Sequence, residues 1–465
     1  MKAYTRLILA AATFALAAPA TAQTLNSSYF MEGSVYRHQL NPAFENQQNY
    51  VSIPIIGNFN SAVRGNFGLG DVLFSHPTSN KTVTYLHPSV SVDDALKGLN
   101  SKNRIQSDIN IQLVSVGFKG LGGFNTITIG TRVFAGLSLP YDLFEMTKNL
   151  QNKNYSLSKA SIYEQSYAEL ALGHSHKIND NWRVGGKLKF LFGAARLNAE
   201  LTDVNLNLQS NNTWTATANA KVEANMKGLN VTTKSETYND AARGSYTTID
   251  DFDVKSPGLG GFGMAVDLGA EYDFQELVPG LKASLAFTDI GFIKWNNNIV
   301  IENAGTPFTF NGFTNVKVMD GDGTKLSDQT DKLADDLADL YHLEYKGDTG
   351  GKTSGLGTTM NIGVEYALPM YDKVRFGLLS STRFQGAYTW NEERLSVNYA
   401  PCKWFDMNIN GAIGTFGPAF GWMLNLHPKG FNLFLGMDKT LGKVSKQWVP
   451  LSSNVQFSMG INIVW

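Results

Sequence analysis

The sequence contains a single cysteine, Cys402, among its 465 residues. One thiol cannot form an internal disulfide, and it excludes the paired cysteines of redox and zinc motifs. Beyond residue 22 the chain also lacks any run of about eighteen apolar residues, which excludes a transmembrane helix in that part of the sequence. If this chain crosses a membrane, it must do so as a closed barrel of strands, because every backbone group in lipid has to be paired.

Charged residues are also scarce, at 17%, compared with about 25% in a typical soluble domain. The 39 basic and 40 acidic residues nearly cancel, which argues against a nucleic-acid-binding surface and gives no reason to expect a polybasic lipid patch. Glycine, with 45 residues, and aromatic residues, at 12%, are abundant instead. This composition is typical of a barrel that faces lipid, and because no linker-like stretch divides the chain we expect one large domain.

The N-terminus has the three parts of a secretory signal peptide. Two basic residues precede an apolar run over residues 7–18, and residues 20–22 form an A-x-A cleavage site. We therefore predict that residues 1–22 are removed and that the mature chain begins at Gln23. Gln23 is not a lipid-accepting cysteine, so we expect an unlipidated protein in the outer membrane of a Gram-negative bacterium.

The C-terminus has the pattern of an outer-membrane strand. Residues 454–465 alternate apolar and polar side chains and end on an aromatic residue, Trp465. Strict alternation predicts a strand with one apolar and one polar face. We interpret Phe457 and Trp465 as the assembly signal for the barrel-insertion machinery. Taken alone, this strand could also be the edge of a soluble β-sandwich.

Further alternating segments have about nine to eleven residues, the length of a tilted transmembrane strand. The clearest are residues 182–192, 262–274 and 360–368. The repeat predicts an all-β fold, a transmembrane antiparallel β-barrel of about 14 strands over residues 50–465. Charged residues on the polar faces of these strands are predicted to line the lumen, either as ion pairs or along a pathway: Arg183, Lys187, Lys189, Asp267, Glu271, Asp273 and Glu365.

The connections between these segments have two lengths, as expected for short periplasmic turns and long external loops. Residues 77–104, 203–253 and 311–357 are the predicted long loops. Within the second of them we expect strands that extend beyond the membrane. Within the third, leucines at helical spacing among aspartates predict an amphipathic helix over residues 327–344.

Residues 23–49 do not alternate and contain the turn-forming sequence Asn41, Pro42, Ala43 and Phe44. An Asn-Pro-Ala triplet between a signal peptide and a barrel resembles the FadL family of outer-membrane transporters for hydrophobic compounds and its Bacteroidota relative PorV. The FadL resemblance implies that residues 23–49 fold back into the lumen as a hatch that contains these four residues. A periplasmic tail is the alternative.

Three longer segments extend this resemblance. Residues 36–44, 108–118 and 136–144 are similar to segments of an uncharacterised outer-membrane family of Bacteroidota, and the similarity covers most of the chain.

Chemical motifs in the sequence lack the context that their chemistry needs. Residues 258–263 match G-x-G-x-x-G but lead into an alternating strand instead of a helix. His174 and His176 share one side of a strand without a third metal ligand at motif spacing. The sequence has no G-x-S-x-G, and we predict no enzyme activity, no catalytic residue, no metal and no cofactor.

Two functions of different classes fit these observations. The resemblance to FadL implies that small hydrophobic or amphipathic molecules bind in an apolar pocket under the hatch. They would leave by hatch movement or laterally through a strand irregularity. The resemblance to PorV implies an accessory barrel without transport, which binds secretion-system proteins through its external loops. Outer-membrane lipid and the insertion machinery are expected partners in both cases, and nucleic acid in neither.

Overall fold

The computed structural model describes residues 25–79, 81–208, 213–239, 243–303, 308–311, 328, 332, 342–439 and 454–465. The predicted signal peptide lies outside the described residues. So does the predicted helix over residues 327–344, apart from Asp328, Lys332 and its last three residues. Among the helices that are described, none has the length and apolar character needed to cross a bilayer.

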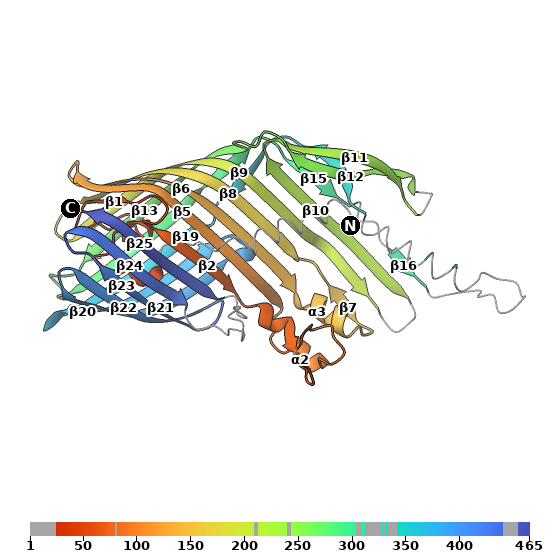
Figure 1. The fold of residues 1–465 in the computed structure, drawn as a ribbon, viewed down its shortest axis with the longest axis horizontal. Coiled ribbons are helices and arrows are strands. Elements are labelled where there is room, and N and C mark those ends of the chain that lie inside the picture. The colour runs from red at the N-terminus through yellow and green to blue at the C-terminus, as the bar shows by residue number, and fades with distance from the viewer. Residues whose placement is uncertain are drawn as a thin grey trace, which may run out of the picture.

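The fold is a closed barrel of 14 antiparallel strands, which confirms the predicted fold class (Figure 1). The last strand, β25, pairs with β2, and β2 pairs with β5, so the sheet closes on itself. A short strand, β1 (Tyr50–Ser52), pairs with the same two neighbours as β2 and continues it. The wall strands are β2 (Phe59–Gly65), β5 (Lys102–Gly120), β6 (Gly123–Pro140), β8 (Ser161–Lys177), β9 (Trp182–Asn207), β13 (Gly261–Asp273), β14 (Leu281–Trp295), β19 (Thr358–Leu368), β20 (Tyr371–Phe384), β21 (Trp390–Cys402), β22 (Phe405–Gly414), β23 (Ala419–Leu426), β24 (Gly430–Lys439) and β25 (Val455–Val464).

On the barrel wall, apolar side chains are exposed and polar side chains are buried, which is the reverse of a soluble protein. Along β25, Met459, Ile461 and Ile463 are exposed, whereas Ser458 and Asn462 are buried. Apolar side chains therefore point away from the barrel, and polar side chains point into it. Such an arrangement is stable only where the surroundings of the barrel are apolar, as in a lipid bilayer.

Substituting arginine for Leu268 should reveal this environment. Leu268 is an exposed residue near the middle of β13, one of the strands that would cross a membrane. We expect Leu268→Arg to destabilise the barrel by about 2–4 kcal/mol, because the charge would lie near the bilayer midplane. Leu121→Arg, in the exposed turn between β5 and β6, is the matched control and should change stability little. Urea-induced unfolding in lipid vesicles measures both, and equal costs would contradict a lipid-facing position for Leu268.

The two ends of the barrel differ. At the turn end, short connections join β5 to β6 and β8 to β9, and the C-terminus lies there as well (Figure 1). The long connections gather at the opposite, loop end. They contain η3 (Leu69–Asp71), β3 (Leu73–Ser75), β4 (Thr82–Thr84), α2 (Val92–Leu96), α3 (Tyr141–Lys148), β7 (Asn154–Ser156), β10 (Trp214–Met226), β11 (Leu229–Thr237), β12 (Ser245–Val254), β15 (Ile299–Glu302), β16 (Phe308–Phe310), β17 (Glu344–Asp348), β18 (Lys352–Gly355) and η5 (Gly386–Tyr388).

Most of the predicted loop over residues 203–253 forms strands: the end of β9, then β10, β11 and β12. The residues of β9 up to Gly193 pair with β13 in the wall, and those from Ala195 onward extend past the wall and pair with β10. β10 pairs in turn with β15 and β16, and the β11–β12 hairpin covers this extension. An apolar core fills the space between them, formed by Leu197, Ala199, Val222, Ala224, Ile249, Ile299, Ile301 and Leu343. The loop end thus carries a folded layer with a core of its own.

Candidate functional site

The N-terminal segment, residues 25–49, lies inside the barrel. It begins with the 3-10 helix η1 (Asn26–Ser28) and contains a second one, η2 (Arg37–Gln39). Most of its residues are buried. The segment contacts strands on several sides of the wall: Tyr29 Oη lies 3.0 Å from Ser284 Oγ of β14, the Gly33 amide donates to Asp406 of β22 at 3.2 Å, and Tyr36 Oη donates to Asn462 of β25 at 2.6 Å. The chain therefore occupies the lumen.

The predicted hatch residues lie against a pair of glycines in the wall. Gly185 of β9 is paired with Gly269 of β13. A Cβ atom on Gly185 would overlap the carbonyl oxygen of Pro42, and one on Gly269 would overlap Asn41 Oδ1. The same Asn41 oxygen accepts a hydrogen bond from the Ala43 amide at 2.9 Å, which closes a tight turn. The turn fits because two neighbouring wall positions lack side chains.

Ion pairs hold the middle of the segment. Glu32 lies 2.5 Å from Arg375 and 3.3 Å from Lys282. Burial alone would raise the pKa of the Glu32 carboxyl, but the charges of Arg375 and Lys282 outweigh burial and hold that pKa well below its ordinary value. Glu45, further along the segment, pairs with Arg183 at 3.2 Å. These contacts fix the segment through side chains and not through a strand ladder.

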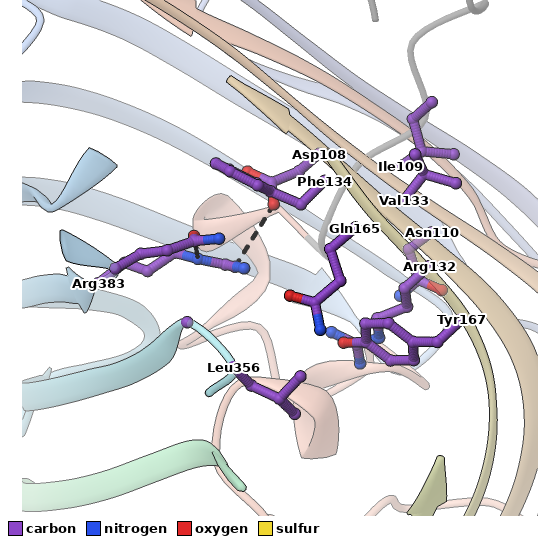
Figure 2. A pocket seen from close by; sticks show the side chains of 12 residues that line it. Asp108, Ile109, Asn110, Arg132, Val133, Phe134, Gln165, Tyr167, Leu356 and Arg383 are labelled. Atoms are coloured by element: carbon purple, nitrogen blue, oxygen red, sulfur yellow. Dashed lines mark hydrogen bonds and ion pairs between the residues drawn. The ribbon is translucent and has the colours of Figure 1, made fainter. Parts of the chain in front are cut away.

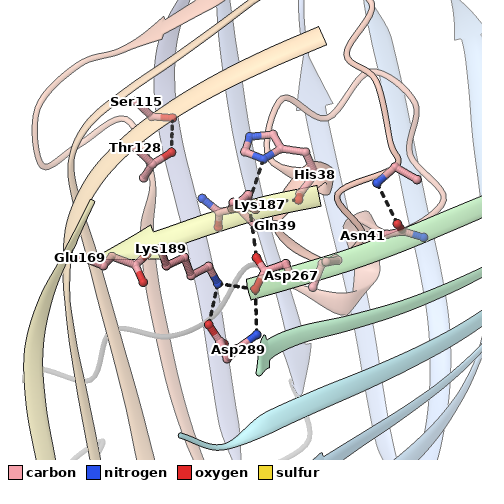
Figure 3. A network of polar contacts seen from close by, with 12 residues as sticks. His38, Gln39, Asn41, Ser115, Thr128, Glu169, Lys187, Lys189, Asp267 and Asp289 are labelled. Atoms are coloured by element: carbon pink, nitrogen blue, oxygen red, sulfur yellow. Dashed lines mark hydrogen bonds and ion pairs between the residues drawn. The ribbon is translucent and has the colours of Figure 1, made fainter. Parts of the chain in front are cut away.

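His38 connects the segment to polar side chains of the wall, and Figure 3 shows its contact with Lys187 of β9. Its Nε2 lies 2.8 Å from Tyr50 Oη, which lies 2.8 Å from Ser115 Oγ. On the other side, Lys187 Nζ donates to the His38 carbonyl at 3.3 Å. Burial lowers the pKa of His38, and the nearby Lys187 charge lowers it further. His38 is therefore neutral at ordinary pH and can share a hydrogen bond with Tyr50.

A buried ion cluster lies beside these side chains (Figure 3). Lys189 Nζ contacts Asp289 at 2.6 Å and Asp267 at 2.8 Å. Arg132 contacts Asp289 at 3.3 Å and Glu169 at 3.0 Å. Asp289 has a left-handed backbone, with φ 61°, where the register of β13 and β14 shifts, and its amide donates to Asp267. The irregularity thus brings a second carboxylate to Lys189.

The predicted lumen-lining residues divide into two groups. Six of them form ion pairs: Lys187 lies 3.9 Å from Asp267, Arg183 lies 3.9 Å from Glu271, Glu365 lies 3.4 Å from Arg375, and Lys189 pairs with Asp267 as described. Asp273 lies instead at the turn end, where it accepts a hydrogen bond from the Gln275 amide. A pathway through the lumen stays a prediction for all seven.

Sequence reasoning did not single out several charged residues of the lumen. One group belongs to the ion cluster around Lys189 and consists of Arg132, Glu169 and Asp289. The other group forms a second cluster nearer the loop end and consists of Arg64, Asp108, Arg383, Glu392, Arg394, Asp438 and Lys439. For Asp289 a signal exists, because the apolar positions of β14 change from odd to even numbers between Phe287 and Ile290. That change of phase marks a bulge.

Small polar cavities lie between the segment and the loop end. One of them, of about 20 Å³, is lined by residues that include Arg132, Tyr167 and Arg383 (Figure 2). A second cavity of similar size shares Arg132 and reaches Leu40 and Trp390. Each has room for about one water molecule. Neither cavity has room for a larger molecule.

The wall carries a dent on its apolar face. Its volume is about 400 Å³, and Leu172, Leu188, Val266 and Leu268 form much of its lining. Gly173, His174, Gly186 and Lys187 line both this dent and a small cavity on the lumen side, where His38, Pro42 and Phe44 lie. Because two of the shared residues are glycines, the wall is thin at this place. The dent and the N-terminal segment therefore lie on opposite sides of the same part of the wall.

Residues 42–438 match the model of a family described as a family of unknown function (DUF5723). No curated protein matches the chain.

Among solved structures, the chain is similar to a deltaS2S3 mutant of the monoaromatic hydrocarbon channel TodX. The two are 8% identical, with a TM-score of 0.39 over 98% of this chain and 97% of the other. It is similar to the toluene transporter TodX of Pseudomonas putida, at 7% identity and a TM-score of 0.35 over 96% and 94%. It is also similar to a FadL homologue of Pseudomonas aeruginosa, at 9% identity and a TM-score of 0.37 over 96% and 98%.

Proposed function

This chain belongs to the family of unknown function DUF5723, and we propose that it is an outer-membrane barrel that passes small hydrophobic or amphipathic molecules. In this proposal the turn end faces the periplasm of a Gram-negative cell, and the N-terminal segment is a movable hatch. A molecule enters from the loop end and leaves sideways, through the thin part of the wall, into lipid. A route that ends in lipid selects for molecules that dissolve there.

The dent carries this proposal, because it lies opposite the hatch across a wall that two glycines make thin. The hatch also has the attachments of a movable part. Besides two apolar clusters, it is held by hydrogen bonds and ion pairs, and each of these polar contacts can exchange for water in an open lumen. Movement of the segment around Pro42 and Phe44 would expose the inner side of the dent.

Filling the dent should block the route. Gly186 faces the dent, and a Cβ atom there would meet Asp267 O at an ordinary 3.7 Å. We expect Gly186→Leu to fold normally and to slow uptake of N-phenylnaphthylamine, a small hydrophobic dye, by severalfold in cells that produce the protein. The rise of dye fluorescence measures uptake.

Gly411 offers a matched control for this experiment. It is an outward-facing glycine of β22, and a Cβ atom there would have no neighbour within 4 Å. Gly411→Leu adds the same side chain to the apolar face away from the dent and should leave uptake unchanged. Equal uptake by the two variants and the unaltered protein would reject the lateral route.

An accessory barrel that binds protein partners is the second candidate function. The folded layer at the loop end favours it, because its apolar core makes a stable surface out of what would otherwise be loops. In this case the N-terminal segment is a permanent plug. A stable co-purifying protein and dye uptake that is insensitive to Gly186→Leu would support the accessory role.

A further inference from the structure

The first residues of the N-terminal segment contact one carboxylate, that of Asp438 in β24. The Asn26 amide donates to Asp438 Oδ2 at 2.6 Å, and the Ser27 amide donates to Oδ1 at 2.9 Å. The Ser27 hydroxyl also bonds to Asp438. Both carboxylate oxygens are thus used by the first turn of the segment, and Asp438 is fully buried.

The wall is built to present this carboxylate. The register of β24 and β25 shifts between Met437 and Lys439, so Asp438 is the extra residue of a bulge. Arg394 lies 3.5 Å from Asp438 and 2.5 Å from Glu392, and Lys439 lies 3.1 Å from Glu392. The charge of Asp438 is therefore balanced by the wall itself, whereas its remaining hydrogen-bonding capacity goes to the segment.

This attachment is separate from the others. Asp438 lies near the loop end, whereas the glycine pair that receives Asn41 and Pro42 lies nearer the turn end, on β9 and β13. Glu32, which lies between the two in sequence, is held by Lys282 of β14 and Arg375 of β20, near the turn end. Losing the contacts to Asp438 would leave the other attachments intact.

We propose that Asp438 is a latch that holds residues 25–28 independently of the rest of the segment, so that the lumen opens in two steps beginning at the loop end. A molecule arriving from the loop end meets the latched turn first. Release of the latch enlarges the space next to Trp390 and Leu40 before the turn at Asn41 has moved. The inference rests on the proposed movement of the hatch, but its test is a labelling rate and not a rate of uptake.

Cysteine labelling can follow the two parts of the segment separately. In a Cys402→Ser background, Ser28→Cys reports on the latched turn, and Ser34→Cys reports on the part near the Gly33 contact to Asp406. Both serines are buried, so a membrane-impermeant maleimide added to intact cells should react slowly with either. Heat-modifiable mobility on gels confirms that each variant is a folded barrel.

Two substitutions weaken the latch, one at the acceptor in the wall and the other at a donor in the segment. Asp438→Asn removes the charge of the acceptor and keeps its shape. Asn26→Pro removes one amide donor without touching the wall, and proline suits this position because Leu25 before it has an extended backbone, with φ −59° and ψ 133°. Asn26→Pro keeps the test valid if the wall variant fails to fold. Asp406→Asn is the matched control, because the Asp406 carboxylate accepts a hydrogen bond from the Gly33 amide of the segment.

We expect both latch variants to speed labelling of Ser28→Cys on the order of tenfold, as for the loss of hydrogen bonds to a charged acceptor. Labelling of Ser34→Cys should stay slow, and Asp406→Asn should not speed labelling of Ser28→Cys. Equal acceleration at both cysteines would overturn the latch by showing that the segment moves as one body. No acceleration at either would overturn it as well. If labelling fails to change while Gly186→Leu still slows dye uptake, the latch fails and the proposed function stands.

Discussion

Barrels that lack residues 36–44 should fold and conduct ions several times better than the intact protein. The deletion removes the turn on the Gly185–Gly269 pair, together with the contacts of Tyr36 and His38 to the wall. Most of the hydrogen-bonding groups that it uncovers can bind water instead, whereas Phe124, Phe434 and Leu379 of the wall lose apolar partners. Single-channel conductance in planar bilayers measures the effect.

The control for this deletion is a loop-end hairpin of similar length. Residues 73–84 contain β3 and β4, and the amide of Tyr85 already donates to the carbonyl of Val72 at 2.8 Å. Joining Val72 to Tyr85 therefore requires little rearrangement and should leave conductance unchanged. If the barrel without residues 36–44 is folded and conducts no better than the intact one, the N-terminal segment is not a hatch, and the accessory role becomes the better proposal.

Lys189→Met should be strongly destabilising. Lys189 is buried and contacts the carboxylates of Asp267 and Asp289, which would face each other without it. Removing one member of a buried ion pair costs about 3–5 kcal/mol, because the remaining charge stays out of water. Unfolding by urea in lipid vesicles would measure this loss.

A second substitution tests the electrostatic cause. Lys189→Met combined with Asp267→Asn removes one of the two carboxylates and should recover part of the loss, since Arg132 still balances Asp289. Lys177→Met breaks an exposed ion pair with Asp180 and should change stability little. A cost for Lys189→Met that the double substitution does not reduce would point to lost packing as the cause.

The wall could be predicted from the sequence because strand periodicity determines both faces at once. Residues such as Met459 and Asn462 were assigned to opposite faces of β25 by alternation alone, and they lie there in the structure. The number of strands followed from counting such segments. Their ends did not, since β5 and β9 continue well beyond the alternating residues that revealed them.

The interior was less predictable, because contacts across the lumen join residues that are distant in sequence. Lys187 and Asp267 were recognised as charged residues on polar faces, but nothing local showed that β9 and β13 are neighbours. Asp438 was missed because it is the one extra residue of a bulge, and alternation assigns no face to such a residue. The position of Asn41 on a glycine pair depends on three separate parts of the chain.

The alternation along the wall strands also has a consequence for export. In a strand such as β25 the outward apolar residues alternate with Gln456, Ser458, Gly460 and Asn462, so the unfolded chain offers no long apolar stretch there, even though apolar side chains cover the outside of the finished barrel. The translocation channel of the inner membrane releases long apolar stretches sideways into its own bilayer, as it does for helical proteins. If residues 1–22 direct export as predicted, this chain can pass through that channel without being retained, and in the proposed outer-membrane location its lipid-facing surface forms only when the strands pair there.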